Sequence, residues 1–391
     1  MAALPTIDEA LALVLAHVTA LPAEDVPVTA VSGRFAAEPV RAAVDLPPFP
    51  SSAMDGYAVR AQDTPGSLRV SGHSAAGSPA GVALSPGEAM EISTGAVVPE
   101  GADAVVPVER TRREGDAVAV EQVAAGENVR PRGGDVRAGD VVVDAGSAIG
   151  PPQAGALAAA GVVSVRCSRR PRVAVLATGS ELRPPGEPLG PGQIYESNSV
   201  LLAAQLASAG CETVVLPPVA DDAGATRAAL ERGLEHDVLI TSGGVSVGPH
   251  DLVRAALAEL GAAVVFWRVA VKPGKPIAFA TRGATLVFGL PGNPVSSLVG
   301  FELFVRPALA ALQGAHDPAP AFLPGELAAP LRQGPDRDEL VRARAANGLL
   351  EPVTGQGSHM IARAAAANAL VFVPRGAGEL PAGTRVRWLP I

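Results

Sequence analysis

The spacing of apolar and polar residues changes along the chain and predicts different structures in different parts. Thr6 and Glu9 have the spacing of a capping box, and the apolar positions after them predict an amphipathic helix that ends near Leu21. A proline-rich stretch begins near Pro47. Residues 51–134 then carry short alternating apolar runs separated by glycine and proline, which is typical of a small β-rich domain.

From about residue 171 onward, apolar runs of strand length alternate with stretches of helical periodicity. The expected strands are 173–177, 213–219 and 237–241, and the expected helices are 198–209, 223–235 and 251–260. This alternation predicts a mostly parallel sheet with helices on both faces. The last part of the chain returns to short strands and turns, so the predicted fold class is α/β plus β.

These patterns divide the 391 residues into several domains. Residues 136–165 have the pattern strand, turn, short helix, strand, and we expect them to rejoin the first segment, which makes the β-rich domain an insertion. The expected domains are a segmented N-terminal or linker domain (1–46 plus 136–168), an inserted β-rich domain (47–135), an α/β domain (169–315) and a C-terminal β domain (316–391).

Composition and charge exclude several classes of protein. The formal net charge of −8 argues against nucleic acid as a partner, because phosphate contacts need clustered cations. The two cysteines, Cys167 and Cys211, allow at most one disulfide and no cysteine-rich zinc site. The N-terminal stretch lacks a basic leader and charged residues interrupt its apolar positions, so it predicts neither a signal peptide nor a membrane span. We therefore expect a soluble cytoplasmic protein with reduced thiols.

The use of lysine is unusual. The chain has 31 lysines and arginines, and only two of them are lysines. Lys272 and Lys275 stand three residues apart in the sequence VKPGKP. A compact ammonium group suits a narrow oxyanion pocket better than the broad fork of arginine. The alternative is a chance pair on a solvated loop, since charged residues are mostly surface residues.

Polar residues follow the predicted strands of the α/β domain, where ligands bind in such sheets. They are Glu181 after the first strand, Asp221 after the second, Ser246 and Asp251 after the third, and Lys272 and Lys275 after the fourth. Three carboxylates suit a hard divalent cation, and the ammonium groups suit phosphate or another oxyanion. Each carboxylate taken singly could equally cap a helix, Asp251 especially.

The glycine-rich turn TSGGVSVG, which contains Gly243 and Gly244, offers backbone N–H groups to an anion. It also matches the nucleophile elbow of serine hydrolases at Ser246, with His316 or His359 as a triad partner. The two preceding glycines, Pro249 and the lack of an HGGG-like segment argue against that class. Neither a P-loop nor a zinc-binding H-E-x-x-H motif is present in the sequence.

The β-rich domain has a second concentration of polar turns. Asp55 lies in PPFPSSAMDGYAVR, Thr94 in EISTGAVVPEG and Asp135 in NVRPRGGD. Any of these residues could serve only to form a turn. In the C-terminal domain the one notable polar cluster is GQGSHM, and an ordinary loop serine remains the default interpretation of Ser358.

Together these motifs resemble the molybdopterin molybdenumtransferase family, which acts last in molybdenum-cofactor synthesis and includes the C-terminal domain of gephyrin. The matching stretches, in chain order, are PPFPSSAMDGYAVR, STGAVVPEGADAVVPVE, NVRPRGGD, ATGSEL, GQIYESN, TSGGVSVGPHD, FWRVAVKPGKP, GLPGNPVSS and GQGSHM. The resemblance implies a four-domain elongated subunit with a molybdopterin-binding α/β domain and a C-terminal β-barrel. It also implies Mg²⁺-dependent insertion of molybdate into adenylylated molybdopterin with release of AMP.

The resemblance further implies a homodimer whose active cleft lies between the α/β domain of one subunit and the β domain of the other. Asp55, Thr94 and Asp135 would come from the partner side. The implied catalytic residues are Asp55, Asp221, Asp251 and Lys272, and the implied magnesium ligands are Glu181, Asp221 and Asp251. The implied substrate-binding residues are Thr94, Asp135, Gly243, Gly244, Ser246, Lys275, Pro291, Pro294 and Ser358.

One departure from the family pattern is Arg268, because some members have lysine there, and we treat it as a secondary anion contact. Molybdopterin adenylyltransferase and molybdoenzymes are further partners that the resemblance suggests. Two alternative functions stay open. The related molybdopterin adenylyltransferases share TSGGVSVG but are usually a single α/β domain, and a non-catalytic scaffold of the gephyrin type would not require the acidic residues.

Overall fold

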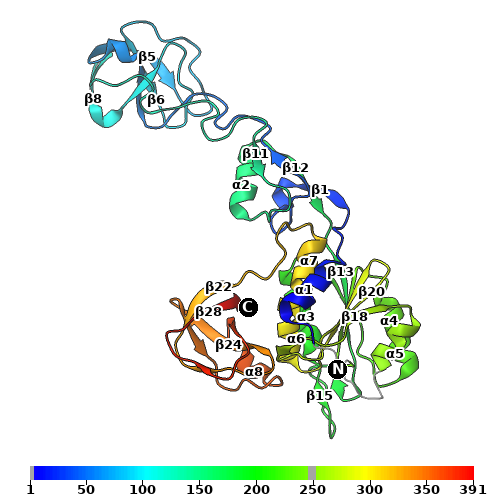
Figure 1. The fold of residues 1–391 in the computed structure, drawn as a ribbon. Coiled ribbons are helices and arrows are strands. Elements are labelled where there is room, and N and C mark those ends of the chain that lie inside the picture. Colours follow the sequence, from blue (N-terminus) through cyan, green and yellow to red (C-terminus); the bar gives the residue numbers. More distant parts are fainter. Residues whose placement is uncertain (1–3, 245–251) are drawn as a thin grey trace. The chain divides into compact units, whose positions relative to one another are not determined.

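The computed structural model describes residues 4–244 and 252–391, and these form two compact units. The first unit comprises Met1–Glu24, Gly33–Ala37 and Cys167–Ile391, and the second comprises Asp25–Ser32 and Glu38–Arg166. The first unit therefore contains both the α/β region and the C-terminal β region, which Figure 1 draws in green to red.

The α/β region is built on a six-stranded sheet with the order β16-β13-β17-β21-β20-β18. Its strands are β13 (Arg172–Ala177), β16 (Glu212–Val215), β17 (Val238–Ser242), β18 (Ala263–Phe266), β20 (Ala278–Arg282) and β21 (Thr285–Leu290). Strands β16, β13, β17 and β21 are parallel, whereas β20 and β18 run antiparallel to their neighbours. The expected parallel core is present, and an antiparallel pair extends it at one edge.

Helices cover both faces of this sheet because successive strand residues face opposite sides. Val173 and Val175 of β13 pack in one core with α1 (Ile7–Leu15), α3 (Asn198–Ser208), α6 (Pro294–Gly300), η4 (Phe301–Val305) and α7 (Arg306–Leu312). Ala174 and Leu176 pack in the other core with α4 (Ala223–Gly233) and α5 (Leu252–Glu259). Figure 1 shows these two helical layers on either side of the sheet, as the alternating pattern predicts.

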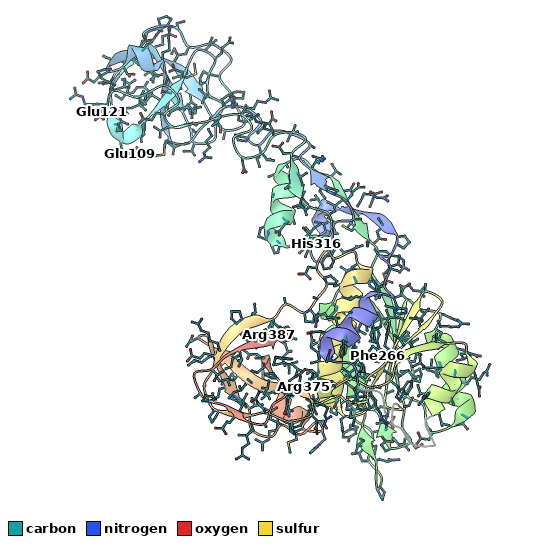
Figure 2. The ribbon with its side chains drawn as sticks, in the orientation of Figure 1. Glu109, Glu121, Phe266, His316, Arg375 and Arg387 are labelled. Carbon is teal, nitrogen blue, oxygen red and sulfur yellow. The ribbon has the colours of Figure 1, made fainter. Side chains whose placement is uncertain are left out.

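The first core is rich in aromatic contacts. The ring of Phe279 lies 5.0 Å from that of Phe288 and 5.9 Å from that of Phe266, centroid to centroid. Figure 2 labels Phe266 in this layer. Residues 294–312 are apolar and long enough to cross a membrane, but 83% of the stretch is buried in the protein. This burial is that of a core helix.

The N-terminal helix α1 has the capping box that the sequence predicts. Thr6 Oγ1 accepts a hydrogen bond from Glu9 N at 3.2 Å, and Glu9 Oε2 accepts one from Thr6 N at 2.8 Å. The helix ends at Leu15, earlier than expected. Its buried face, Ile7, Ala10 and Val14, belongs to the α/β core, although the sequence assigned this segment to the segmented N-terminal domain.

The C-terminal region is a closed β-barrel, because the sheet order β19-β24-β25-β22-β28-β26 is completed by pairing of β24 with β26. Its strands are β19 (Val271–Lys272), β22 (Leu323–Leu327), β24 (Asp338–Ala346), β25 (Leu349–Pro352), β26 (Ala369–Val373) and β28 (Arg385–Pro390). Strand β19 comes from the α/β region of the sequence and pairs in parallel with β24. Lys272 therefore follows the α/β strand β18 along the chain but itself lies on a strand of the barrel.

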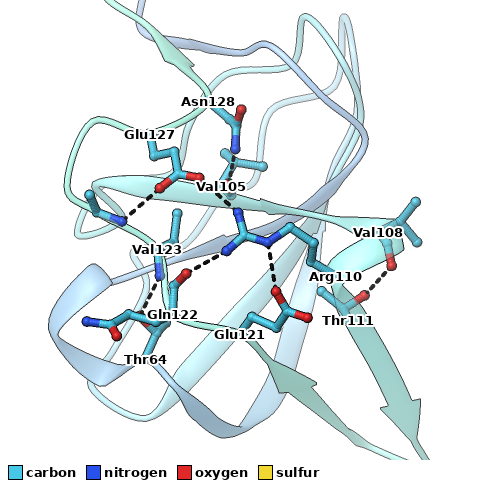
Figure 3. A network of polar contacts seen from close by, with 11 residues as sticks. Thr64, Val105, Val108, Arg110, Thr111, Glu121, Gln122, Val123, Glu127 and Asn128 are labelled. Atoms are coloured by element: carbon cyan, nitrogen blue, oxygen red, sulfur yellow. Dashed lines mark hydrogen bonds and ion pairs between the residues drawn. The ribbon is translucent and has the colours of Figure 1, made fainter.

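The second unit is mainly a six-stranded sheet with the order β7-β4-β6-β5-β9-β8. Its strands are β4 (Gly56–Val59), β5 (Gly66–Ser74), β6 (Glu88–Ile92), β7 (Ala104–Pro107), β8 (Thr111–Glu114) and β9 (Ala117–Val120). Elsewhere in the second unit, the Arg110 guanidinium donates to Glu121 Oε2 at 3.0 Å and to Glu127 Oε1 at 2.9 Å (Figure 3). The same unit contains β1 (Ala23–Pro27), β2 (Val40–Arg41), β11 (Val141–Val143), α2 (Pro151–Ala159) and β12 (Ser164–Ser168) in whole or in part.

The start of β13 is held by a bidentate ion pair. Asp237 Oδ1 and Oδ2 accept from the Arg169 guanidinium at 2.7 and 2.6 Å, and Oδ2 also accepts from Arg172 N at 2.8 Å. Burial acts to raise the pKa of Asp237, but these hydrogen bonds and the nearby positive charges outweigh it and hold that pKa below its ordinary value.

We predict that Asp237→Asn lowers the free energy of unfolding by about 2 kcal/mol at pH 7, the usual size for charge-assisted hydrogen bonds. A carboxylate with a depressed pKa stabilises the fold above its unfolded pKa of about 3.9, and that contribution is lost as the pH falls through the folded pKa. The difference between wild type and variant, measured by urea unfolding, should therefore shrink below about pH 4. The exposed Glu235→Gln is the control, and an equal effect from it would contradict the prediction.

Candidate active site

The candidate site forms where the parallel strands of the α/β sheet end. Thr178 and Glu181 follow β13, Asp221 follows β16, Gly243 follows β17 and Pro291 follows β21. The strand ladder extends into these turns, because Thr178 N donates to Ser242 O at 3.0 Å and Gly243 N donates to Leu290 O at 3.1 Å. The turns of three adjacent strands are thus fixed relative to one another by backbone hydrogen bonds.

A cavity of about 620 Å³ opens at this edge, a size typical of small-molecule sites. Its lining includes six of the predicted site residues, namely Glu181, Asp221, Gly243, Gly244, Lys275 and Pro291. The structure therefore brings together residues that are up to about a hundred positions apart in the sequence, as expected for the carboxyl end of an open α/β sheet. The predicted residues Ser246 and Asp251 lie outside the described residues.

Two carboxylates border this first cavity. Ser180 Oγ donates to Asp221 Oδ2 at 3.0 Å and accepts from Asp221 N at 2.9 Å, so the hydroxyl fixes the orientation of the aspartate. Glu181 is exposed and lies on the same turn as Ser180. Within residues 4–244 and 252–391, no group of three His, Cys, Asp or Glu side chains is close enough to bind a metal on its own.

Two cations, Arg268 and Lys275, line the same cavity as the carboxylates. The sequence predicted only a secondary role for Arg268, as an anion contact. In the structure it lines the first cavity, as Lys275 does. Lys272 is different, since its ammonium forms an ion pair with the Glu339 carboxylate at 3.1 Å. The Lys272 side chain is 55% exposed and that of Glu339 only 12%. The ammonium of Lys272 therefore offsets the negative charge of a largely buried carboxylate of the barrel.

The two glycines of the turn are needed for backbone geometry. Gly243 has φ +89° and Gly244 has φ +64°, and a Cβ on Gly243 would come within 2.7 Å of Thr178 O. Larger residues are therefore excluded by both conformation and space. The N–H group of Gly243 is already bonded to Leu290 O, so it is not one of the free anion donors that the sequence suggested.

A second cavity, of about 530 Å³, adjoins the first and shares Thr178, Glu181, Gly292 and Asn293 with it. The predicted residue Pro294 lines this second cavity, as does His359 from the barrel. It also contains Tyr195, Glu196, Asn198 and Ser242, to which the sequence assigned no role. The available signal was GQIYESN, a polar stretch directly before a predicted helix.

Ser358 is tied to the α/β region by two hydrogen bonds. Its Oγ accepts from Asn293 Nδ2 at 3.0 Å, and its carbonyl accepts from Val295 N at 3.1 Å. Because Asn293 lines both cavities, Ser358 lies beside the candidate site and contacts it through that residue.

Arg342, which is only 1% exposed, holds the loop that contains Ser358. Its guanidinium donates to the carbonyl oxygens of Gly355, Gly357 and Met360 at 2.8, 3.1 and 2.9 Å. Burial lowers the pKa of Arg342 below the ordinary arginine value. The Arg342 side chain therefore fixes the conformation of the loop by donating hydrogen bonds to three of its backbone carbonyls.

The remaining predicted residues lie in the second unit. Asp55 Oδ1 accepts from Thr94 N at 2.6 Å, so these two exposed residues are direct neighbours. Asp135 is exposed, and its N–H donates to Leu46 O at 2.9 Å. Close by, the hydrogen bond from Ala138 N and the Arg132 guanidinium lower the pKa of Asp45. Of the three predicted residues in this unit, Asp55 and Thr94 are therefore joined by a hydrogen bond, and Asp135 is bonded to Leu46 instead.

Comparison with protein families assigns each part of this architecture. Residues 5–161 match the MoeA N-terminal region (domain I and II), residues 174–311 match a probable molybdopterin binding domain, and residues 324–391 match the MoeA C-terminal region (domain IV). Together with the α/β sheet and the closed barrel, these matches define a multidomain protein of the MoeA type with a molybdopterin-binding-type α/β domain.

Curated relatives identify the family. The chain is 40% identical to molybdopterin molybdenumtransferase 2 of Mycobacterium tuberculosis over 93% of each chain. It is 36% identical to molybdopterin molybdenumtransferase of Nostoc sp., covering 93% of this chain and 87% of the relative. A crystal structure of the molybdopterin biosynthesis MoeA protein from Pyrococcus horikoshii is 30% identical, covers 99% of this chain and 100% of its own, and gives a TM-score of 0.86. The chain belongs to the molybdopterin molybdenumtransferase family, whose members are transferases of molybdenum-cofactor biosynthesis.

We predict that Arg342→Leu destabilises the protein by about 3 kcal/mol, because it removes a buried guanidinium and leaves three loop carbonyls without their donor. Thermal unfolding measures the effect, and hydrogen exchange should show that residues 354–360 lose protection first. Arg344 lies on the same strand and is exposed, so Arg344→Leu should change stability by less than about 0.5 kcal/mol. Equal stabilities of the two variants would contradict the structural role of Arg342.

Proposed function

We propose that this protein inserts molybdate into adenylylated molybdopterin in a Mg²⁺-dependent reaction that releases AMP and yields the molybdenum cofactor. The observation that carries the proposal is the grouping of two carboxylates, Glu181 and Asp221, with two cations, Arg268 and Lys275, around one cavity. That grouping occurs in a chain whose relatives are named molybdopterin molybdenumtransferase. The proposed place of action is the cytoplasm.

The residues present fit a magnesium ion. Mg²⁺ is usually held by one or two carboxylates together with substrate phosphates and waters, and two carboxylates border the first cavity. We propose Glu181 and Asp221 as ligands, with Asp251 as a third. When bound, Mg²⁺ would offset negative charge on the phosphate oxygens.

The cations supply the complementary half of the chemistry. Cleavage of a phosphoanhydride places negative charge on phosphate oxygens, and preorganised positive groups stabilise that charge. Lys275 and Arg268 border the cavity in which the phosphates would lie. Molybdate is a tetrahedral dianion, so the same positive charges suit it as well, and Gly243 and Gly244 would border it. Pro291, Pro294 and Ser358 would complete the binding surface.

We further propose that the active protein is a homodimer and that Asp55, Thr94 and Asp135 reach the cavity from the second copy. The exposure of all three side chains and the fixed pairing of Asp55 with Thr94 support a role in contact with another molecule. Molybdopterin adenylyltransferase would supply the substrate, and molybdoenzymes would accept the product.

Mixing two inactive variants tests the shared cleft. Asp55→Ala and Asp221→Ala should each be inactive as homodimers, while subunit exchange between them should restore about a quarter of wild-type activity, since each mixed dimer keeps one intact cleft. No recovery after verified exchange would show that both aspartates serve a cleft within one subunit. AMP release is the measurement.

For the metal site, we predict that Asp221→Ala lowers AMP release from adenylylated molybdopterin by at least about 100-fold while the fold is kept, because a magnesium ligand is lost. Asp222 is the matched control, since its Oδ1 caps α4 by accepting from Ala225 N at 2.7 Å. Asn is as good a cap as Asp, so Asp222→Asn should have wild-type activity. A wild-type rate of AMP release by Asp221→Ala would contradict the proposed metal site.

Lys272 allows its structural and catalytic roles to be separated. Lys272→Arg keeps a cation opposite Glu339, so stability should be unchanged. We predict that AMP release nevertheless falls at least about tenfold, because the guanidinium fork does not replace a compact ammonium beside an oxyanion. Full activity with unchanged melting temperature would assign Lys272 to the ion pair alone.

A further inference from the structure

We infer that the second cavity binds the pterin end of the substrate and that Glu196 determines its specificity for that end over adenine. This inference rests on the proposed function, because it divides the proposed substrate between two adjoining cavities. It assigns the phosphates to the first cavity and the flat heterocycle of the pterin to the second.

Charge separates the two cavities. The first contains Arg268 and Lys275, which suit phosphates. The described lining of the second contains the carboxylates of Glu181 and Glu196 and neither lysine nor arginine. An anionic group would be repelled there, so an uncharged group rich in hydrogen-bond donors is the favoured occupant. Four shared residues make the cavities continuous, which suits one molecule with two different ends.

Asn198 lines the second cavity and has a buried acceptor without a partner. Its Nδ2 donates to Ser242 Oγ and to Gly292 O, both at 2.7 Å. A carbonyl can only accept, so the contact with Gly292 O fixes the orientation of the amide. Asn198 Oδ1 is then left buried without a hydrogen bond in a residue that is only 7% exposed. Such an atom is costly unless a ligand pairs with it.

Glu196 supplies a second acceptor in the same lining. The residue is 8% exposed, and its Oε1 accepts from Ser199 N at 2.9 Å, at the start of α3. No hydrogen bond to its other carboxylate oxygen occurs among the described residues. Two buried residues of the lining, Glu196 and Asn198, therefore each have an acceptor that no described protein group pairs with.

Two acceptors distinguish a pterin from an adenine. The pyrimidinone edge of a pterin presents an amino group and a ring N–H, which are both donors. The edge of adenine presents an amino donor beside a ring-nitrogen acceptor, and that acceptor would face an acceptor of the protein. The ring of Tyr195 adds a flat surface for stacking, and its hydroxyl is held by donation to Glu187 O at 3.0 Å.

The alternative is that Glu196 only caps α3. Glu196→Gln distinguishes the two roles, because the amide oxygen of Gln can still accept from Ser199 N while its NH₂ group places a donor in the cavity. A cap-only role predicts no change in ligand binding. The subsite role predicts weaker pterin binding and stronger adenine binding, since a donor beside the Asn198 acceptor complements the adenine edge.

The test is fluorescence titration of the full-length protein with free pterin (2-amino-4-oxopteridine), with adenosine as competitor. We expect saturable pterin binding by the wild type with little competition from adenosine. In Glu196→Gln we expect pterin affinity to fall by about tenfold to hundredfold, the range for loss of a hydrogen bond to a charged group, and adenosine to compete better. Glu187→Gln, an exposed carboxylate outside both cavity linings, should bind as the wild type does.

Equal pterin affinities of wild type and Glu196→Gln, or no saturable binding by the wild type, would overturn the inference. If Glu196→Gln is poorly folded, the competition between pterin and adenosine on the wild type decides alone. Release of AMP by the wild type is measured in parallel. Release of AMP with unchanged pterin affinity in the variant would refute only the pterin subsite, whereas altered pterin affinity without AMP release would refute only the proposed reaction.

Discussion

The structure of the candidate site depends on the register of the parallel strands β13, β17 and β21. Ala177 pairs with Ser242, and Ser242 pairs with Leu290, so the three strands end at one level. Everything that follows these residues, from Thr178 to Pro291, therefore enters the same edge of the sheet. A slip of one residue in any strand would exchange the side chains that face the two helical layers, so burial of both faces keeps this register in place.

The sequence predicted strands of this sheet because each is a short apolar run between stretches of helical periodicity. Strands β13 and β17 are buried almost throughout, the helices between them have apolar faces, and α1 has a recognisable cap. It could not predict that β18 and β20 are antiparallel or that the two-residue strand β19 joins the barrel. Strand direction and the partner of a very short strand are decided by contacts distant in the sequence, which no local pattern contains.

The same distinction applies to the site. Glu181 and Asp221 could be predicted because they stand directly after strands, where topology alone places them together. The pairing of Lys272 with Glu339 depends on a contact across 67 positions, and the buried state of Glu196 and Asn198 depends on packing around α3. A polar residue at the start of a helix is usually an exposed cap, so the sequence around Glu196 and Asn198 gives no sign that they are buried. Only the folded structure distinguishes a buried polar residue from an exposed cap.

Burial of these polar side chains explains how one sheet edge can treat two ends of a molecule differently. The lining of the first cavity contains two carboxylates and two cations, and Ser180 fixes the orientation of one of the carboxylates, Asp221. The second places a buried carboxylate and a buried amide in a lining without lysine or arginine among its described residues. A buried acceptor that lacks a donor is unfavourable in the free protein, and a ligand that supplies the donor recovers that free energy. Affinity for a donor-rich heterocycle would then arise from the fold of α3 itself, independently of the charges that bind phosphate.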